Sequence, residues 1–338
     1  MACYYPIHGY RSKQGRFQFS SRGAISKMVV PCGGCVGCRL KRAGEWAVRG
    51  THEAQLHLDN DFITLTIGHI PADRGLVCKD FQDFMKLFRE RFNYPDVRYI
   101  VAGEYGELCK LCDLPSPSSR SPIKCTCKVY VKGLGRPHYH AIFFNFKFPD
   151  KTYWYTSKQG HKVYRSKILE SLWTYGNSEI GSVTPQSIAY VARYVMKKQN
   201  GKVADAHYEW FDKETGEVFW REPEFAHYST KPAIGHDWFM KYHESVFPHD
   251  YIIFNGRKVR PPRYYDKLYV RITGQCIKRS TGDFDEFDIC EFSEAFDAIK
   301  ETRLESARKH LDDNTPDRLR VKEQCVLAKT QKLVRKLT

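Results

Sequence analysis

The fold is decided by one stretch, Gly135-Arg136-Pro137-His138-Tyr139-His140-Ala141-Ile142-Phe143-Phe144-Asn145-Phe146. Its aromatic and branched residues predict a β-strand over 136–146. Apolar side chains occupy both faces of that strand, Ile142 and Phe144 on one and Ala141 and Phe143 on the other, which is typical of a central strand. We therefore expect this strand to lie inside a sheet that is covered on both sides.

The segments around this strand predict both helices and strands. Helices are expected over 39–58, 80–92, 166–173 and 184–199, and strands over 61–67, 98–102 and 179–183. After residue 200 the pattern weakens, and strands and turns are expected to about residue 290, with a break at Pro261-Pro262. The tail 300–338 is helical in character and carries eleven Lys/Arg against six Asp/Glu. That tail either binds DNA or forms a solvated charged helix.

The central strand begins with a pair of histidines. Alternation puts the imidazoles of His138 and His140 on one face, where two neutral rings can bind a divalent metal, although such pairs are more often structural. Glu104 follows the strand at 98–102, and antiparallel pairing of the two strands would bring it to the histidines. Two histidines and a carboxylate suit Mg²⁺ or Mn²⁺ beside a phosphate. A solvated turn carboxylate is the alternative for Glu104, and Glu107 lies close by.

The helix expected over 184–199 has Thr184 as its N-cap and Pro185 at its first position. At about 100° per residue, Tyr190, Tyr194 and Lys197 share one stripe of this helix. A separate apolar stripe lies nearly opposite and consists of Ile188, Val191, Ala192 and Val195. Because the helix already has a face for the core, phenols beside cations favour phosphate chemistry over packing.

These residues together suit cleavage of a DNA phosphodiester. A tyrosine hydroxyl with a pKa near 10 is a poor nucleophile, and a nearby lysine and a metal-bound phosphate favour its phenolate. Attack by Tyr190 or Tyr194 would leave a 5′-phosphotyrosine and a 3′-hydroxyl that can prime synthesis. The second tyrosine could later cleave the regenerated site and let the strand be rejoined. DNA contacts are expected from Arg136, Arg193 and Lys198.

Composition narrows the class of protein. The 338 residues carry a formal net charge of +15, which predicts a polyanionic partner such as nucleic acid. Apolar runs such as 141–144 are far shorter than the roughly 18 residues of a membrane span, and no signal peptide is recognisable at the N-terminus. No Gly-x-x-x-x-Gly-Lys-Ser/Thr loop is present, so we expect no nucleotide-driven motor.

Seven of the twelve cysteines fall in two tight clusters, which favours metal binding or free thiols in a reducing cytosol over a disulfide framework. One cluster offers four thiolates for a tetrahedral zinc site: Cys109, Cys112, Cys125 and Cys127. The other supplies three, with Cys3 or a histidine as a candidate fourth ligand: Cys32, Cys35 and Cys38. The alternative for the second cluster is a reduced cysteine turn shaped by its glycines. The other cysteines are isolated and are expected to be packing or surface residues.

The chain resembles the His-hydrophobic-His (HUH) endonucleases and, more narrowly, the replication initiation proteins of gokushoviruses, small single-stranded DNA phages of the Microviridae. The resemblance rests on an ordered set of segments that covers most of residues 1–240: Pro31–Arg39, Trp46–Arg49, Phe62–Thr66, Gly103–Glu107, Gly135–His140, Tyr190–Val195 and, more loosely, Lys231–Gly235. The tyrosines follow the histidines, as in replication initiators.

The resemblance implies an α+β fold, with a ferredoxin- or RRM-like antiparallel sheet, flanking helices and a less regular C-terminal region. By position, His138, His140 and Glu104 would bind the metal. The family's alternating nucleophiles would be Tyr190 and Tyr194, with Lys197 assisting at the phosphate. Implied partners are single-stranded origin DNA and the host helicase, polymerase and single-strand binding protein in the host cytoplasm, with no membrane. The segment 108–134 departs from the family, in which this connection is shorter.

We expect four segments along the chain. They are a cysteine-cluster and helix region (1–58), a nuclease core (59–200) with a cysteine-bearing insertion (108–134), an accessory region (201–299) and a basic helical tail (300–338). Two other functions fit parts of the sequence. One is a non-catalytic, zinc-dependent nucleic-acid-binding protein whose tyrosines stack on bases. The other is a relaxase or transposase of the same superfamily.

Overall fold

The strand expected over 136–146 is β6 (Lys132–Phe144), and it lies inside a sheet of seven antiparallel strands. The strand order is β12-β5-β6-β4-β9-β8-β7, so β6 has a neighbour on each side. The other six strands are β4 (Asn60–Thr66), β5 (Arg98–Cys109), β7 (Thr152–Thr156), β8 (Lys162–Arg165), β9 (Ser178–Ser182) and β12 (Phe225–Tyr228). The expected α+β class with a large antiparallel sheet is confirmed.

The computed structural model describes residues 3–13, 15–68, 75–109, 111–112, 114, 125–128, 132–157, 160–193, 198, 202–211, 215–274, 293–310 and 312–337. The chain forms two compact units. One comprises Met1–Arg42, Glu244–Tyr251 and Arg263–Leu337, and the other comprises Ala43–His243 and Ile252–Pro262. The division into four segments stays a prediction.

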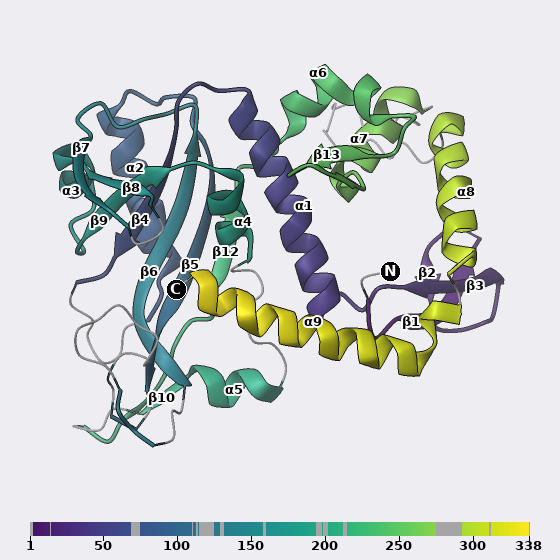
Figure 1. Ribbon diagram of the computed structural model, residues 1–338, viewed down its shortest axis with the longest axis horizontal. Helices are drawn as coiled ribbons and strands as arrows, with labels where there is room; N and C mark the ends of the chain where they lie inside the picture. Colours follow the sequence, from purple (N-terminus) through teal and green to yellow (C-terminus); the bar gives the residue numbers. More distant parts are fainter. Residues whose placement is uncertain are drawn as a thin grey trace. The chain divides into compact units, whose positions relative to one another are not determined.

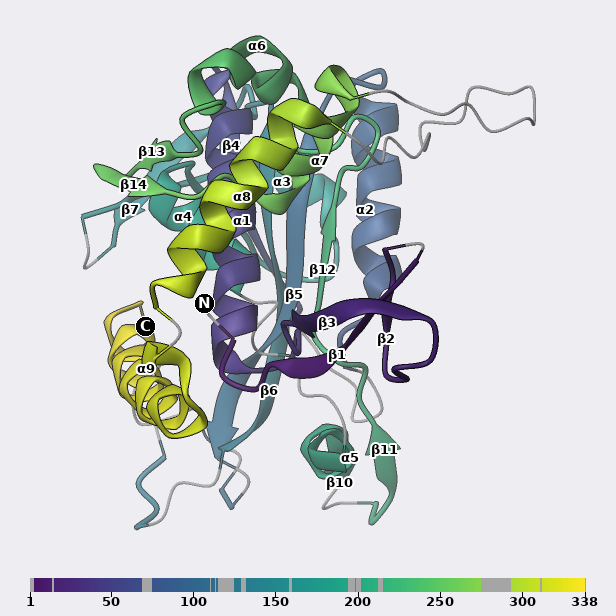
Figure 2. The ribbon, with the colours of Figure 1, turned by 90° about the vertical axis from the view of Figure 1, so that its right-hand side faces the viewer.

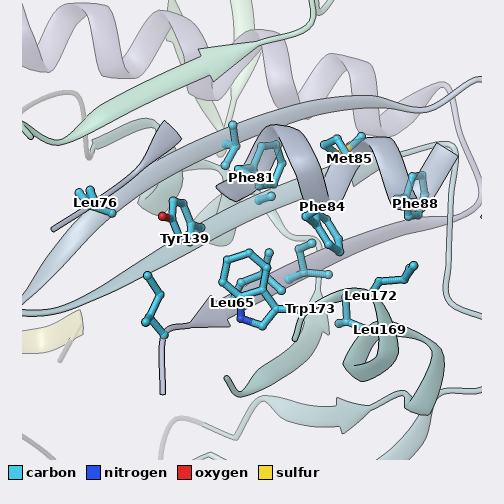
Figure 3. Close-up of a cluster of buried hydrophobic side chains, with 14 of the residues drawn as sticks. Leu65, Leu76, Phe81, Phe84, Met85, Phe88, Tyr139, Leu169, Leu172 and Trp173 are labelled. Carbon is cyan, nitrogen blue, oxygen red and sulfur yellow. The ribbon is translucent and has the colours of Figure 1, made fainter. Parts of the chain in front are cut away.

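One face of the large sheet carries the main hydrophobic core. Helix α2 (Cys78–Arg91) buries Phe81, Phe84, Met85 and Phe88, whose spacing places them on one side of the helix. They pack with Tyr139 and Phe143 of β6 and with Trp173, which follows the short helix α3 (Lys167–Leu172). Figure 3 shows α2 and Trp173 on the two sides of this cluster.

The opposite face of the sheet is covered by α1 (Val36–Gln55) and α4 (Pro185–Arg193), as Figure 1 shows. Ile100, Ile142 and Phe144 of the sheet pack there against Ile188 and Val191 of α4. Both faces of β6 are thus buried, in agreement with its apolar pattern.

Helix α4 begins as its sequence predicts. The Thr184 hydroxyl accepts a hydrogen bond from the Ser187 amide at 3.1 Å, and the Ser187 hydroxyl accepts one from the Thr184 amide at 2.8 Å. This reciprocal pair satisfies amides that the first turn leaves without a helical partner. The apolar stripe of α4 faces the sheet, since Ile188, Val191 and Ala192 are buried.

The first unit has a small sheet of its own, β2-β1-β3, visible in Figure 2. Its strands are β1 (Ile7–Ser12), β2 (Phe17–Gln18) and β3 (Ala24–Val30). The unit also contains α7 (Arg263–Thr273), α8 (Glu294–Arg308), the short 3-10 helix η2 (Asp312–Asn314) and α9 (Pro316–Leu337). Arg303 of α8 forms ion pairs with Asp250 and Asp266, which binds α8 to α7 and to the segment before it. The expected helical tail is thus present.

The expectation for residues 200–290 is only partly correct. Short strands do occur, in the hairpins β10 (Glu209–Phe211) with β11 (Val218–Trp220) and β13 (Ile252–Phe254) with β14 (Arg257–Val259). Helices α5 (Lys202–Tyr208), α6 (His236–Val246) and α7 were missed. Their many tyrosines, histidines and tryptophans have weak helix propensity, and tertiary packing overrides it. No helix in the described part of the chain has the length and apolarity that crossing a bilayer requires.

Candidate metal and nucleophile site

Glu104, His138 and His140 come together because β5 and β6 pair antiparallel. Glu104 lies opposite His138 in the register, and His140 lies opposite Ala102. The Nε2 atoms of His138 and His140 are 2.5 Å and 3.1 Å from the same carboxylate oxygen of Glu104. The expected approach of these three side chains is therefore present, and their ligand atoms lie within 4.8 Å of one another.

The burial of this group favours a function over a surface role. Glu104 is 3% exposed and His140 is 6% exposed, so the carboxylate is not the solvated turn residue of the alternative interpretation. A buried carboxylate is costly unless it is paired or binds a cation. The set of two nitrogen donors and one oxygen donor fits a divalent metal with open positions. Glu107 is the neighbouring candidate, and it pairs with Leu134 further along the strands.

Contacts behind the rings fix their orientation. The hydroxyl oxygen of Thr64, on the neighbouring strand β4, lies 3.1 Å from Nδ1 of His140. The Nδ1 of His138 lies 3.1 Å from the backbone carbonyl of Arg136. In both rings Nε2 is thereby left directed toward Glu104. Such contacts select the tautomer of a metal-binding imidazole and hold its plane. Thr64 lies in a quoted motif, but its role was missed because its partner is 76 residues away.

Tyr190 of α4 lies beside this group. Its ring centroid is 5.2 Å from that of His140, at an interplanar angle of 73°. The ring is half-buried and packs at the edge of the cluster formed by Ile142 and Ile188. We expected it to point away from the core. It instead lies at the border between the core and the histidines, because α4 packs on the face of the sheet that carries both histidines.

The remaining predicted residues have different positions. Arg136 is exposed at the start of the histidine motif, Arg193 is half-buried at the end of α4, and Lys198 is exposed. Tyr194 and Lys197 lie outside the described residues. Their roles, like those of Tyr190 and the three candidate ligands, stay predictions.

Comparisons with known proteins now bear on this geometry. The family model for replication-associated proteins of the ORF2 type matches residues 117–199, the range that contains both histidines and Tyr190. The chain is 34% identical over 283 residues to Replication-associated protein VP4 of Bdellovibrio phage phiMH2K, covering 80% of this chain and 77% of the relative. The chain belongs to the family of Microviridae replication-associated proteins.

Two further members of the family support this membership. Replication-associated protein ORF2 of Spiroplasma virus 4 is 27% identical over 298 residues, which cover 80% of this chain and 81% of the relative. Replication-associated protein ORF4 of Chlamydia phage 1 is 26% identical over 285 residues, which cover 81% of this chain and 59% of the relative. No solved structure matches the chain. The predicted recognition is confirmed at the level of the family.

Proposed function

We propose that the chain is a replication initiator that nicks single-stranded DNA at a phage origin, remains bound through a 5′-phosphotyrosine and rejoins the product strand. Membership of a phage replication-associated family supports the first part. The observation that supports the chemistry best is the position of Tyr190, whose ring lies 5.2 Å from a histidine of the candidate metal group. A nucleophile beside a phosphate-binding metal is what phosphodiester cleavage requires.

In this proposal Glu104, His138 and His140 hold Mg²⁺ or Mn²⁺, which when bound polarises the scissile phosphate and stabilises its developing charge. The Tyr190 oxygen forms a bond to phosphorus, and the bond from phosphorus to the 3′ oxygen breaks. The phenolic proton ends on the departing 3′ oxygen. The free 3′-hydroxyl then primes synthesis by a host polymerase, while the 5′ end stays on the protein.

The half-buried position of Tyr190 suits this role. Packing against Ile188 and the edge of the core restricts the ring, so its oxygen does not have to be ordered when DNA binds. Arg193, on the same helix, can neutralise a phosphate at the site. Tyr194 is proposed as the second nucleophile and Lys197 as the residue that assists at the phosphate.

Adduct formation tests the proposal. Single-stranded oligonucleotides that tile the genome of the encoding phage are incubated with the protein and Mn²⁺. For one oligonucleotide, the 3′-labelled fragment should migrate with the protein on a denaturing gel. The 5′-labelled fragment should be released with a 3′-hydroxyl that a polymerase extends. A chelator should abolish both signals.

The tyrosine assignment is tested in the same assay. We expect Tyr190→Phe combined with Tyr194→Phe to abolish the adduct, and each single variant to show which residue attacks first. Tyr242→Phe, on the exposed side of α6, is the matched control and should react like the wild type. An adduct in the double variant would refute the assignment of the nucleophiles. Tight DNA binding without any adduct would favour the non-catalytic, zinc-dependent alternative.

A further inference from the structure

The structure groups four cysteines at the N-terminal end of the chain. The sulfur atoms of Cys3, Cys32, Cys35 and Cys38 all lie within 4.8 Å of one another. Cys3 precedes β1, Cys32 follows β3, and Cys38 lies in the first turn of α1, so three separate segments supply the group. The sequence left the fourth member open between Cys3 and a histidine, and the geometry points to Cys3.

The spacing of the sulfurs fits one tetrahedral ion. Four sulfurs at about 2.3 Å from zinc are about 3.8 Å apart, and Cys32 Sγ lies 4.0 Å from Cys38 Sγ. A disulfide would need a sulfur–sulfur distance of about 2.05 Å, and the four cysteines are free thiols. Cys3 and Cys38 are buried at 1% and 8% exposure, so the group is largely shielded from water, as a structural metal site is.

Backbone amides point at the sulfurs as they do at metal-bound thiolates. The amide of Cys32 donates to Cys3 Sγ at 3.2 Å, and that of Cys35 donates to Cys32 Sγ at 3.3 Å. The amide of Tyr4 donates to Cys35 Sγ at 3.4 Å. The left-handed conformation of Gly33 (φ 75°) lets the chain turn between Cys32 and Cys35. Three sulfurs therefore act as acceptors, which is the role of a thiolate rather than of a thiol donor.

The small sheet has an independent need for such a staple. Between Tyr4 and Val36, no apolar side chain of the described residues is buried. A three-stranded sheet without a core of its own is not stable in water, and small units of this kind are commonly held by disulfides or by a structural metal. An ion bound by Cys3, Cys32 and Cys38 would join both ends of the β1–β3 segment to the start of α1.

We propose that Cys3, Cys32, Cys35 and Cys38 bind a structural zinc ion that fixes the small sheet to helix α1. The metal–thiolate bonds supply stabilisation that burial of apolar side chains supplies elsewhere. The positive end of the α1 dipole and the basic residues of its first turns, among them Arg39 and Arg42, offset the negative charge of four thiolates.

A second group of four cysteines carries the same inference independently. The sulfurs of Cys109, Cys112, Cys125 and Cys127 also lie within 4.8 Å of one another. Cys109 ends β5, and its amide donates to the Leu114 carbonyl at 2.8 Å. The other pair precedes β6, and the amide of Cys127 donates to Cys125 Sγ at 3.4 Å. A second zinc ion here would close the base of the connection between β5 and β6.

The metal content of the purified full chain tests both sites. Measurements are made in a His138→Ala/His140→Ala background, so that the histidine group contributes no metal. We expect two zinc ions per chain, one in the Cys3→Ser variant, one in the Cys127→Ser variant and none in their combination. Cys325→Ser, which changes an exposed cysteine outside both groups, is the matched control and should retain two. Two ions in the Cys3→Ser variant would overturn the assignment of Cys3.

X-ray absorption at the zinc edge keeps the proposal testable if a variant fails to fold. In the protein with all cysteines intact, each zinc should have four sulfur neighbours at about 2.3 Å. Nitrogen or oxygen neighbours, iron in place of zinc, or a protein without bound metal would overturn it. Neither measurement depends on DNA cleavage, so failure of the zinc proposal and failure of the proposed function are distinguishable.

Discussion

At the scale of single residues, the candidate site depends on contacts that hold each imidazole. His140 is placed between the Thr64 hydroxyl at its Nδ1 and the Glu104 carboxylate at its Nε2, each at 3.1 Å. The ring of Phe62 is stacked on it at a centroid distance of 5.7 Å. Three strands therefore fix one ring, and little rotation is left to be lost when an ion binds.

Thr64→Val removes the hydroxyl and keeps the shape of the side chain. We expect the affinity for Mn²⁺ to fall by about 10- to 100-fold, because the ring loses the contact that selects its tautomer. Titration calorimetry with Mn²⁺ measures this effect. Thr64→Ser keeps the hydroxyl and should bind Mn²⁺ like the wild type. Equal affinities for the valine and wild-type proteins would show that Thr64 does not orient His140.

His52 gives the stability of the second unit a pH dependence. The side chain is 3% exposed and stacks on Trp238, and burial lowers its pKa to about 3. The unfolded chain has a histidine pKa of about 6.5. Above that pH the ring is neutral in both states. As the pH falls toward 3, only the unfolded state binds the proton, so the free energy of unfolding decreases by up to about 1.4 kcal/mol per pH unit.

His52→Phe keeps an aromatic ring at this position and removes the titration. We expect its unfolding free energy to depend less steeply on pH than that of the wild type between about pH 6 and pH 4. Urea unfolding at several pH values measures both slopes. Parallel slopes would mean that His52 is protonated in the folded protein.

At the scale of elements, α1 and α4 pack on the sheet through a close approach at Gly50. A Cβ atom at Gly50 would lie 2.6 Å from Cγ2 of Ile188 and 3.0 Å from Cδ1 of Ile100. The absence of a side chain at this position of α1 thus allows α4 to lie where Tyr190 meets His140. Gly44, six residues earlier on the same helix, has no heavy atom within 4 Å of such a Cβ.

Gly50→Ala should lower the free energy of unfolding by about 1–3 kcal/mol, because the added methyl group overpacks the contact between the two helices and the sheet. Gly44→Ala is the control, and it should be neutral or stabilising by about 0.5–1 kcal/mol since alanine is the better helix former. Thermal or urea unfolding of the two variants measures the difference. Similar stabilities would contradict the close packing at Gly50.

Much of the fold and part of the site could be predicted from the sequence. The spacing of Phe81, Phe84 and Phe88 identified α2, and the alternation in β6 placed both histidines on one face, because such patterns are local. The β7–β8 hairpin and the helices between residues 200 and 274 were missed, since their apolar residues follow no clear period. The roles of Thr64 and Gly50 depend on partners distant in sequence, which no local pattern contains.

At the scale of the whole molecule, the charge of +15 acts on DNA beyond the contacts of the site. Counterion release makes such binding depend steeply on salt. The charge is distributed over both units, so an effect of total charge has to be separated from the effect of a single contact. Arg136, exposed beside the histidine motif, offers that comparison.

Arg136→Gln should reduce the slope of log affinity against log salt by about 1 and weaken binding for all sequences, as expected for one lost phosphate contact. Fluorescence anisotropy with labelled single-stranded DNA, in a Tyr190→Phe/Tyr194→Phe background without divalent metal, measures the slope. Arg308→Gln changes the net charge equally from an exposed position on α8 and should leave the slope unaltered. Equal slopes for wild type and Arg136→Gln would contradict the predicted contact.

The position of the histidines on β6 has a genetic consequence. His140 is two residues from Ile142, and that residue packs against the helix that carries Tyr190. Modest substitutions at Ile142, Ile188 or Val191 should therefore yield heat-sensitive alleles, in which plaques form at low temperature and are lost on warming. Alleles of His138 and His140 should be defective at every temperature. A screen for conditional mutants would thus outline the underside of α4, while a screen for nulls would outline the site itself.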